Sequence, residues 1–128
     1  MGDISLHFDR AQFACKGKAC CGGSAPISER LIEALECLHF ITWHRSEDLP
    51  FEFVVNSGFR CLTHNREIGS EDTSQHPLGF AVDIAPVGLT PIKLAGLAKY
   101  VPDFADGGIG LYPGFVHLDV RRVGKARW

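Results

Sequence analysis

His76 and Asp83 are polar residues whose types and spacing point to chemistry. Pro77 and Gly79 lie between them and favour a turn, whereas Asp83 sits in the apolar segment FAVDIA, which favours a strand. An isolated ionised carboxylate among apolar neighbours is costly unless it is paired or bound to a metal ion. The spacing therefore predicts a loop imidazole that folds back over a strand carboxylate.

The segment FVHLDVR (115–121) carries a second set of polar residues. Successive side chains of a strand point to opposite faces, so His117, Asp119 and Arg121 would share one face and the apolar residues between them the other. Two imidazoles and one carboxylate are a common ligand set for catalytic zinc, which keeps a fourth position open for water. A single histidine is more often a surface or packing residue, but the two segments together favour a metal site.

The elements that must position these residues follow from the periodicity of the apolar residues. Leu31, Leu35 and Leu38 recur at steps of three and four, which predicts an amphipathic helix over residues 27–45. The segment FEFVVNS (51–57) is rich in β-branched and aromatic residues and is typical of a strand.

Shorter elements are expected in the second half of the chain. They are a helix capped by Thr63 and ended by Gly69, a polar loop at 70–75, a strand at 79–86 ended by Pro86, a helix from Thr90-Pro91 to about Tyr100, and two short strands joined at Pro113-Gly114. This pattern predicts an α+β fold, with a small, mostly antiparallel sheet and flanking helices.

Length and composition indicate one globular domain over residues 1–128, with an irregular, cysteine-containing segment at 1–25. The formal net charge is −2 and no block of lysine and arginine is present, which argues against nucleic acid as a partner. No window approaches the roughly 20 apolar residues that span a bilayer. The first residues, MGDISLHFDR, carry acids where a signal peptide carries bases, so we expect synthesis in the cytoplasm without a signal peptide.

The cysteines are Cys15, Cys20, Cys21, Cys37 and Cys61, and in a cytoplasmic chain they would stay reduced. The segment FACKGKACCGG could be half of a second, structural zinc site, but it has no CxxC pair and no matching pair follows it. A tight glycine-rich loop with partly buried thiols is the simpler interpretation. Cys37 falls within the helical pattern and is expected to fill the core.

The segments VVNSGFRCLTHNREIGSEDTSQHPLGFAVDI and GIGLYPGFVHLDVRR resemble the zinc D-alanyl-D-alanine carboxypeptidases and murein endopeptidases, above all their small bacterial and phage forms. The shared motifs are S-G-x-R, S-x-H-x-x-G-x-A-x-D-I and F-V-H-x-D-x-R, and the resemblance covers roughly residues 50–128. The wider fold group includes the zinc-containing signalling domain of hedgehog proteins. The resemblance implies one zinc ion per chain, bound by His76, Asp83 and His117.

The same resemblance suggests roles for several neighbours of the metal. Arg60, from S-G-x-R, would steady the substrate carbonyl or carboxylate, for which the planar guanidinium is suited. A structural pair between Arg60 and Asp119 or another acid is the alternative. Ser74, Gln75 and Tyr112 would contact substrate, although the solubility of a loop explains the first two equally well.

The general base is the point at which the sequence departs from the family. Several relatives place a catalytic Glu or Asp three residues before the last histidine ligand, where this chain has Gly114. Asp119, on the face of His117, would act either as the base or by orienting a ligand. Glu71 and Tyr112 are weaker candidates for the base.

The function implied by the resemblance is zinc-dependent hydrolysis of the peptide stem or cross-link of bacterial peptidoglycan. The expected partners are peptidoglycan stem peptides, the expected state is a monomer, and the site of action is the periplasmic or extracellular cell wall, reached by a separate delivery route. The alternative is a non-catalytic, zinc-containing binding module of the same fold, which the missing acid at position 114 favours.

Overall fold

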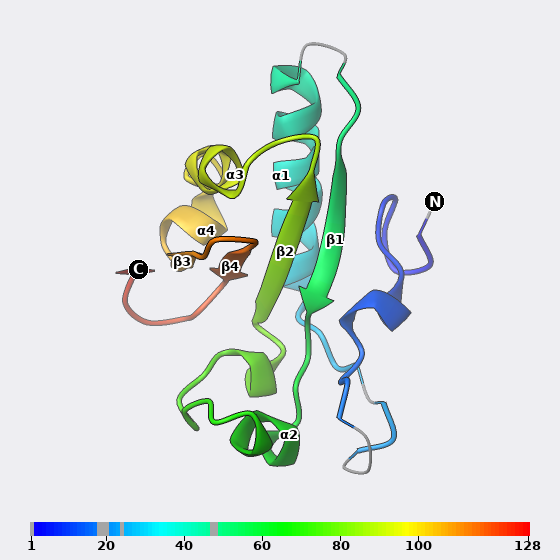
Figure 1. The fold of residues 1–128 in the computed structure, drawn as a ribbon, viewed down its shortest axis with the longest axis vertical. Helices are drawn as coiled ribbons and strands as arrows, with labels where there is room; N and C mark the ends of the chain where they lie inside the picture. Colours follow the sequence, from blue (N-terminus) through cyan, green and yellow to red (C-terminus); the bar gives the residue numbers. More distant parts are fainter. Residues whose placement is uncertain (1, 18–20, 24, 47–48) are drawn as a thin grey trace.

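The computed structural model describes residues 2–17, 21–23, 25–46 and 49–128, which form an α+β fold around one five-stranded sheet (Figure 1). The strand order is β1-β2-β4-β3-β5. Neighbouring strands are antiparallel except β3 and β5, which are parallel. The strands are β1 (Glu52–Ser57), β2 (Ala81–Val87), β3 (Gly108–Leu111), β4 (Val116–Asp119) and β5 (Ala126–Arg127). The expected mostly antiparallel sheet is confirmed.

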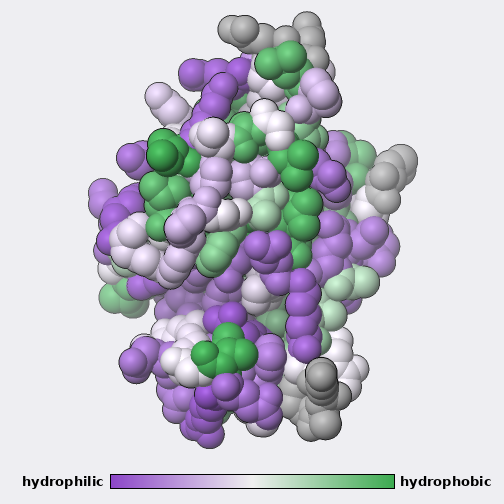
Figure 2. All heavy atoms as spheres, viewed as in Figure 1, coloured by the Kyte–Doolittle hydropathy of each residue, from purple (hydrophilic) through white to green (hydrophobic). Residues whose placement is uncertain are grey.

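The longer helices, α1 and α3, pack together on one side of this sheet. Helix α2 lies apart from them, below β1 and β2 at the bottom of Figure 1. The helices are α1 (Glu29–Arg45), α2 (Leu62–Glu67), α3 (Pro91–Ala98) and α4 (Pro102–Ala105), with 3-10 turns η1 (Arg10–Phe13) and η2 (His76–Leu78). In the view of Figure 1, α1 runs behind β1 and β2. The α2 end is also the more hydrophilic part of the surface in Figure 2.

The core lies between α1 and the sheet. Leu31, Leu35 and Leu38 of α1 are fully buried, as the periodicity predicted, and they belong to the same apolar cluster as Val82 and Leu118. Burying an aliphatic side chain of this size contributes about 1.5–3 kcal/mol to stability. The packing on one face of β2 and β4 therefore fixes which side chains emerge on the opposite face.

The N-terminal segment joins this core as well. Phe8 and Phe13 are buried in the same cluster, and η1 was not expected from the sequence. The short α4 and β5 were not expected either, because elements of four and two residues leave little periodicity to detect.

Three expectations from the sequence were wrong in detail. Helix α2 is capped by Cys61, whose Sγ accepts the backbone N–H of His64, so Thr63 lies inside the helix. Strand β2 continues past Pro86 to Val87, since its pairing with β4 ends at Ile84 and a proline is tolerated where one side of a strand is unpaired. Cys37 is exposed on α1 and does not fill the core.

Other boundaries agree with expectation. Thr90 caps α3, its Oγ1 accepting the Lys93 N–H at 3.1 Å, and Gly69 follows α2 with a positive φ of 79°. Among the described residues, no helix is both long and apolar enough to cross a membrane.

Candidate metal centre

Asp83 and His117 face each other across two neighbouring strands. They are direct partners in the antiparallel pairing of β2 with β4. Their strand neighbours, such as Val82 and Leu118, point into the core, so alternation places the carboxylate and the imidazole together on the other face. The His117 Nδ1 atom lies 3.1 Å from Asp83 Oδ1.

His76 reaches the same carboxylate from the loop, as its spacing predicted. It begins the turn η2, is almost fully buried, and places Nε2 at 3.4 Å from Asp83 Oδ1. Its Nδ1 lies 2.7 Å from the carbonyl oxygen of Gly58. Because a carbonyl only accepts hydrogen bonds, Nδ1 carries a proton, and Nε2, which faces Asp83, is the ring nitrogen left for a metal ion.

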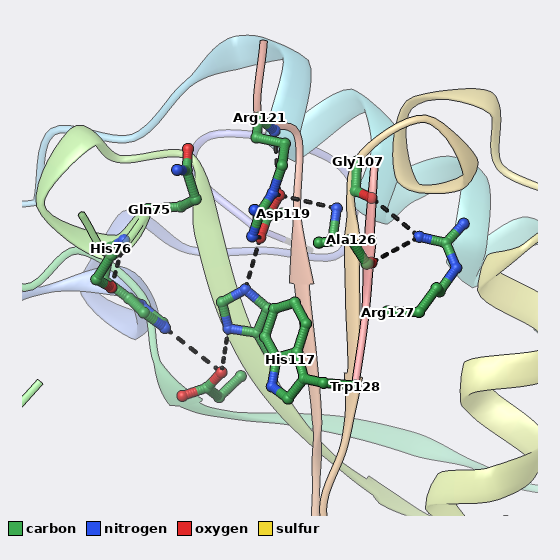
Figure 3. A network of polar contacts seen from close by, with 12 residues as sticks. Gln75, His76, Gly107, His117, Asp119, Arg121, Ala126, Arg127 and Trp128 are labelled. Atoms are coloured by element: carbon green, nitrogen blue, oxygen red, sulfur yellow. Dashed lines mark hydrogen bonds and ion pairs between the residues drawn. The ribbon is translucent and has the colours of Figure 1, made fainter. Parts of the chain in front are cut away.

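Asp119 determines which ring nitrogen of His117 carries a proton, as the Gly58 carbonyl does for His76. His117 Nε2 donates to Asp119 Oδ2 at 2.7 Å, and Asp119 lies between His117 and Arg121 (Figure 3). The buried Asp119 carboxylate also accepts the Gly108 N–H at 2.9 Å and two guanidinium N–H groups of Arg121 at 2.8 and 2.7 Å. With Nε2 donating to Asp119, Nδ1 is the ring nitrogen of His117 that faces Asp83 and is left for a metal ion.

One donor atom from each of His76, Asp83 and His117 lies within 4.8 Å of the other two. A tetrahedral zinc ion about 2.1 Å from each donor would hold the donors roughly 3.4 Å apart. The two measured separations from Asp83 Oδ1, 3.1 and 3.4 Å, are close to that value. Two imidazole nitrogens and a carboxylate oxygen that converge in this way suit a cation between them.

The charge states of the site favour a cation too. Burial opposes ionisation of Asp83, but hydrogen bonds with His117 and His76 hold its pKa well below the usual range. Burial also lowers the pKa of His117, yet hydrogen bonds with Asp119 and Asp83 outweigh it and raise that pKa. The electrostatic field that favours a proton on His117 favours a metal ion at the same point.

An open cleft of about 360 Å³ lies over these three side chains. The structure brings together here every residue that the sequence suggested for substrate contact: Arg60, Ser74, Gln75 and Tyr112. The carboxylates among the described residues that line the cleft are Asp83 and Glu71. Asp119 lies behind His117 instead, fully buried.

Arg60 is held beside the cleft by neutral partners. Its Nε donates to Asn65 Oδ1 at 2.9 Å and its Nη1 to Ser57 Oγ at 3.4 Å. The alternative pairing of Arg60 with Asp119 was wrong, because Asp119 pairs with Arg121. Burial lowers the pKa of Arg60, and the nearby charge of Asp83 opposes that change.

Asn65 and Trp128 are two site residues that the sequence did not reveal. Asn65 is fully buried, and its Nδ2 donates to the backbone carbonyl of Glu71, which connects Arg60 to the loop over the cleft. Trp128 lies beside His117 (Figure 3), with ring centroids 4.8 Å apart, and its Nε1 donates to Tyr112 Oη at 2.7 Å.

Gly110 is the sequence signal that could have indicated the position of Trp128. It is the β3 partner of His117, and a Cβ atom built there would lie 2.4 Å from the indole ring. Glycine inside a strand often marks the close approach of another group. The partner was not predictable, since Trp128 reaches Gly110 only because β5 pairs with β3.

A comparison with models of known protein families matches residues 6–119 to the family described as peptidase M15. The matched span contains the three candidate ligands, Arg60 and Asp119. No curated protein matches the chain.

Proposed function

Because the chain belongs to the peptidase M15 family, zinc metallopeptidases that act on peptidoglycan, we propose that it hydrolyses an amide bond in the stem peptide or cross-link of that polymer. The observation that carries this proposal is the convergence of three zinc-type donor atoms at the base of an open cleft. Arg60 and Arg121 line the same cleft, and guanidinium groups suit the carboxylates of stem peptides.

In the proposed reaction, His76, Asp83 and His117 would hold zinc, which supplies Lewis-acid chemistry and lowers the pKa of a bound water to about 7. Arg60 donates hydrogen bonds to the scissile carbonyl oxygen as negative charge develops on it. A carboxylate in the cleft accepts the proton of the attacking water and returns it to the leaving amine. Water adds to the carbonyl carbon, the C–N bond breaks, and no covalent intermediate with the protein is required.

We propose Glu71 for the proton transfer and a positioning role for Asp119. Both oxygens of Asp119 already accept hydrogen bonds, and it contacts His117 on the ring edge opposite to Asp83. Burial raises the pKa of Asp119, but Arg121 and His117 more than offset this and hold it well below its usual range, so it is a weak base. Glu71 lines the cleft itself.

Replacing Asp119 by Asn is expected to lower the affinity for zinc by about 10–100-fold. The N–H groups of Gly108 and Arg121 would hold the one amide oxygen, so His117 would face the NH2 group and lose its acceptor. Replacing Glu71 by Gln should leave zinc affinity unchanged and lower kcat by about 10²–10⁴-fold. Zinc titration calorimetry and turnover of a stem peptide measure the two effects separately. Glu67→Gln, on the exposed end of α2, is the matched control. Full zinc affinity with lost turnover in Asp119→Asn would assign the base to Asp119 instead.

The test of the proposed activity is incubation of the purified protein with intact peptidoglycan and with soluble stem peptides, with and without a chelator. Chelator-sensitive release of D-alanine indicates a carboxypeptidase, and cleavage of cross-linked dimers or internal bonds indicates an endopeptidase. Mass spectrometry of the products identifies the bond. Bound zinc without cleavage of any fragment would favour the non-catalytic binding module, the candidate supported by Gly114 in place of an acid.

A further inference from the structure

A second group of potential metal ligands lies outside the cleft. The Sγ atoms of Cys15, Cys21 and Cys61 all lie within 4.8 Å of one another, and the Cys15 and Cys61 sulfurs are 3.8 Å apart. These thiols come from two segments that are far apart in the sequence. Cys15 is buried, and the other two are half-buried.

Contacts of the backbone bring the two segments together. The Phe59 N–H donates to the carbonyl oxygen of Phe13 at 2.8 Å. Gly58 permits this approach, because a Cβ atom there would lie 2.6 Å from the Cα of Phe13. Cys15 follows Phe13 by two residues, and Cys61 follows Phe59 by two. The buried Phe13 side chain therefore fixes the register in which the thiols meet.

We propose that Cys15, Cys21 and Cys61 bind a second zinc ion, with a structural role. Sulfur atoms about 2.3 Å from a tetrahedral zinc ion lie roughly 3.8 Å from one another, and this matches the separation of the Cys15 and Cys61 sulfurs. Thiolates are the ligands that zinc favours in structural sites, and a water or another side chain can take the fourth corner.

The surroundings of the group suit thiolates. Cys61 Sγ accepts the backbone N–H of His64 at 3.4 Å, the kind of hydrogen bond that orients a metal-binding sulfur. The half site suggested by the N-terminal cysteines is thus completed by a cysteine that follows the S-G-x-R motif.

This position connects the second metal to the cleft. The segment 58–61 carries Arg60, and the Gly58 carbonyl accepts the proton that orients His76. A zinc ion that joins Cys61 to Cys15 and Cys21 would hold this segment against the N-terminal part of the chain. Its loss is therefore expected to loosen the positions of Arg60 and His76.

The test is the zinc content of the full chain, purified under reducing conditions without a chelator and measured by elemental analysis. We expect two zinc ions per chain in the wild type, and one in each of the variants Cys61→Ser and His117→Ala. Cys37→Ser removes an exposed thiol of α1 and should keep both ions. The two single-ion variants differ in which site is empty.

Substitution of zinc by cobalt distinguishes the two sites by their absorption spectra. This measurement does not depend on whether a cysteine variant folds. After chelation and reconstitution with Co²⁺, thiolate-to-cobalt charge-transfer absorption should appear in the wild type and persist in His117→Ala. One zinc per chain in the wild type without that absorption would overturn the proposal. So would a disulfide between Cys15 and Cys61 found by peptide mapping of the protein as purified. Because His117→Ala retains the thiol group, a failure of the peptidase proposal does not affect this test.

Discussion

Replacement of His117 by Ala is expected to abolish peptidase activity and to remove one equivalent of zinc. His117 is the candidate ligand contributed by β4, and its Nδ1 lies 3.1 Å from the Asp83 carboxylate. Without the ion, the pKa of a water molecule is no longer lowered to about 7, so hydroxide is no longer supplied at neutral pH. Turnover of a stem peptide should fall below detection, and elemental analysis of the same sample measures the lost zinc.

The control for this variant is His44→Ala, which changes an exposed histidine of α1. It should retain wild-type zinc and wild-type turnover. Circular dichroism shows whether His117→Ala still folds, since the core face of β4, with Val116 and Leu118, is untouched by the change. A folded His117→Ala protein that still cleaved substrate at the wild-type rate would show that this histidine is not a ligand of the catalytic ion.

The side chains on regular strands were the ones that the sequence could place. Alternation along β2 and β4 puts Asp83 and His117 on the face opposite to the core, and this periodicity is visible in FAVDIA and FVHLDVR. That the two residues face each other depends on the register between β2 and β4, which alternation alone does not give. The family resemblance suggested the pairing.

Contacts between short, irregular segments could not be predicted from the sequence. Trp128 reaches His117 through a strand of two residues, and Asn65 is buried because its amide bridges Arg60 and the backbone of Glu71. Neither residue has a local pattern that distinguishes it from a surface residue. The capping of α2 by Cys61 was missed for a related reason, since Thr63 is the commoner type of cap.

The sequence left Asp119 with two equal roles, and its contacts in the structure bear on the choice between them. Strand alternation predicted that it shares a face with His117, and this is compatible with either a base or a positioning residue. Its buried carboxylate and its bonds to Gly108 and Arg121 are visible only in three dimensions. These contacts support the positioning role and direct the search for the base to the loop that carries Glu71.

Arg60→Lys is expected to lower kcat/KM by about 10²–10³-fold, the effect of removing one well-placed donor to a developing oxyanion. Lysine keeps the positive charge but loses the planar fork and the Nε donor that Asn65 Oδ1 holds at 2.9 Å. Zinc content should not change, since Arg60 donates to Asn65 and Ser57 and lies outside the three ligands. Steady-state kinetics on a stem peptide measure the loss.

Arg66→Lys is the matched control for this change. Arg66 lies in α2, is largely exposed, and pairs with the exposed Asp72 at 2.8 Å, an interaction that solvent weakens. Its replacement should leave the kinetics unchanged.

A more direct test adds guanidinium to Arg60→Ala, since a planar cation that binds in the vacated space would restore part of kcat without altering zinc content. Wild-type kinetics for Arg60→Lys would show that Arg60 supports the loop through Asn65 and does not act on the substrate.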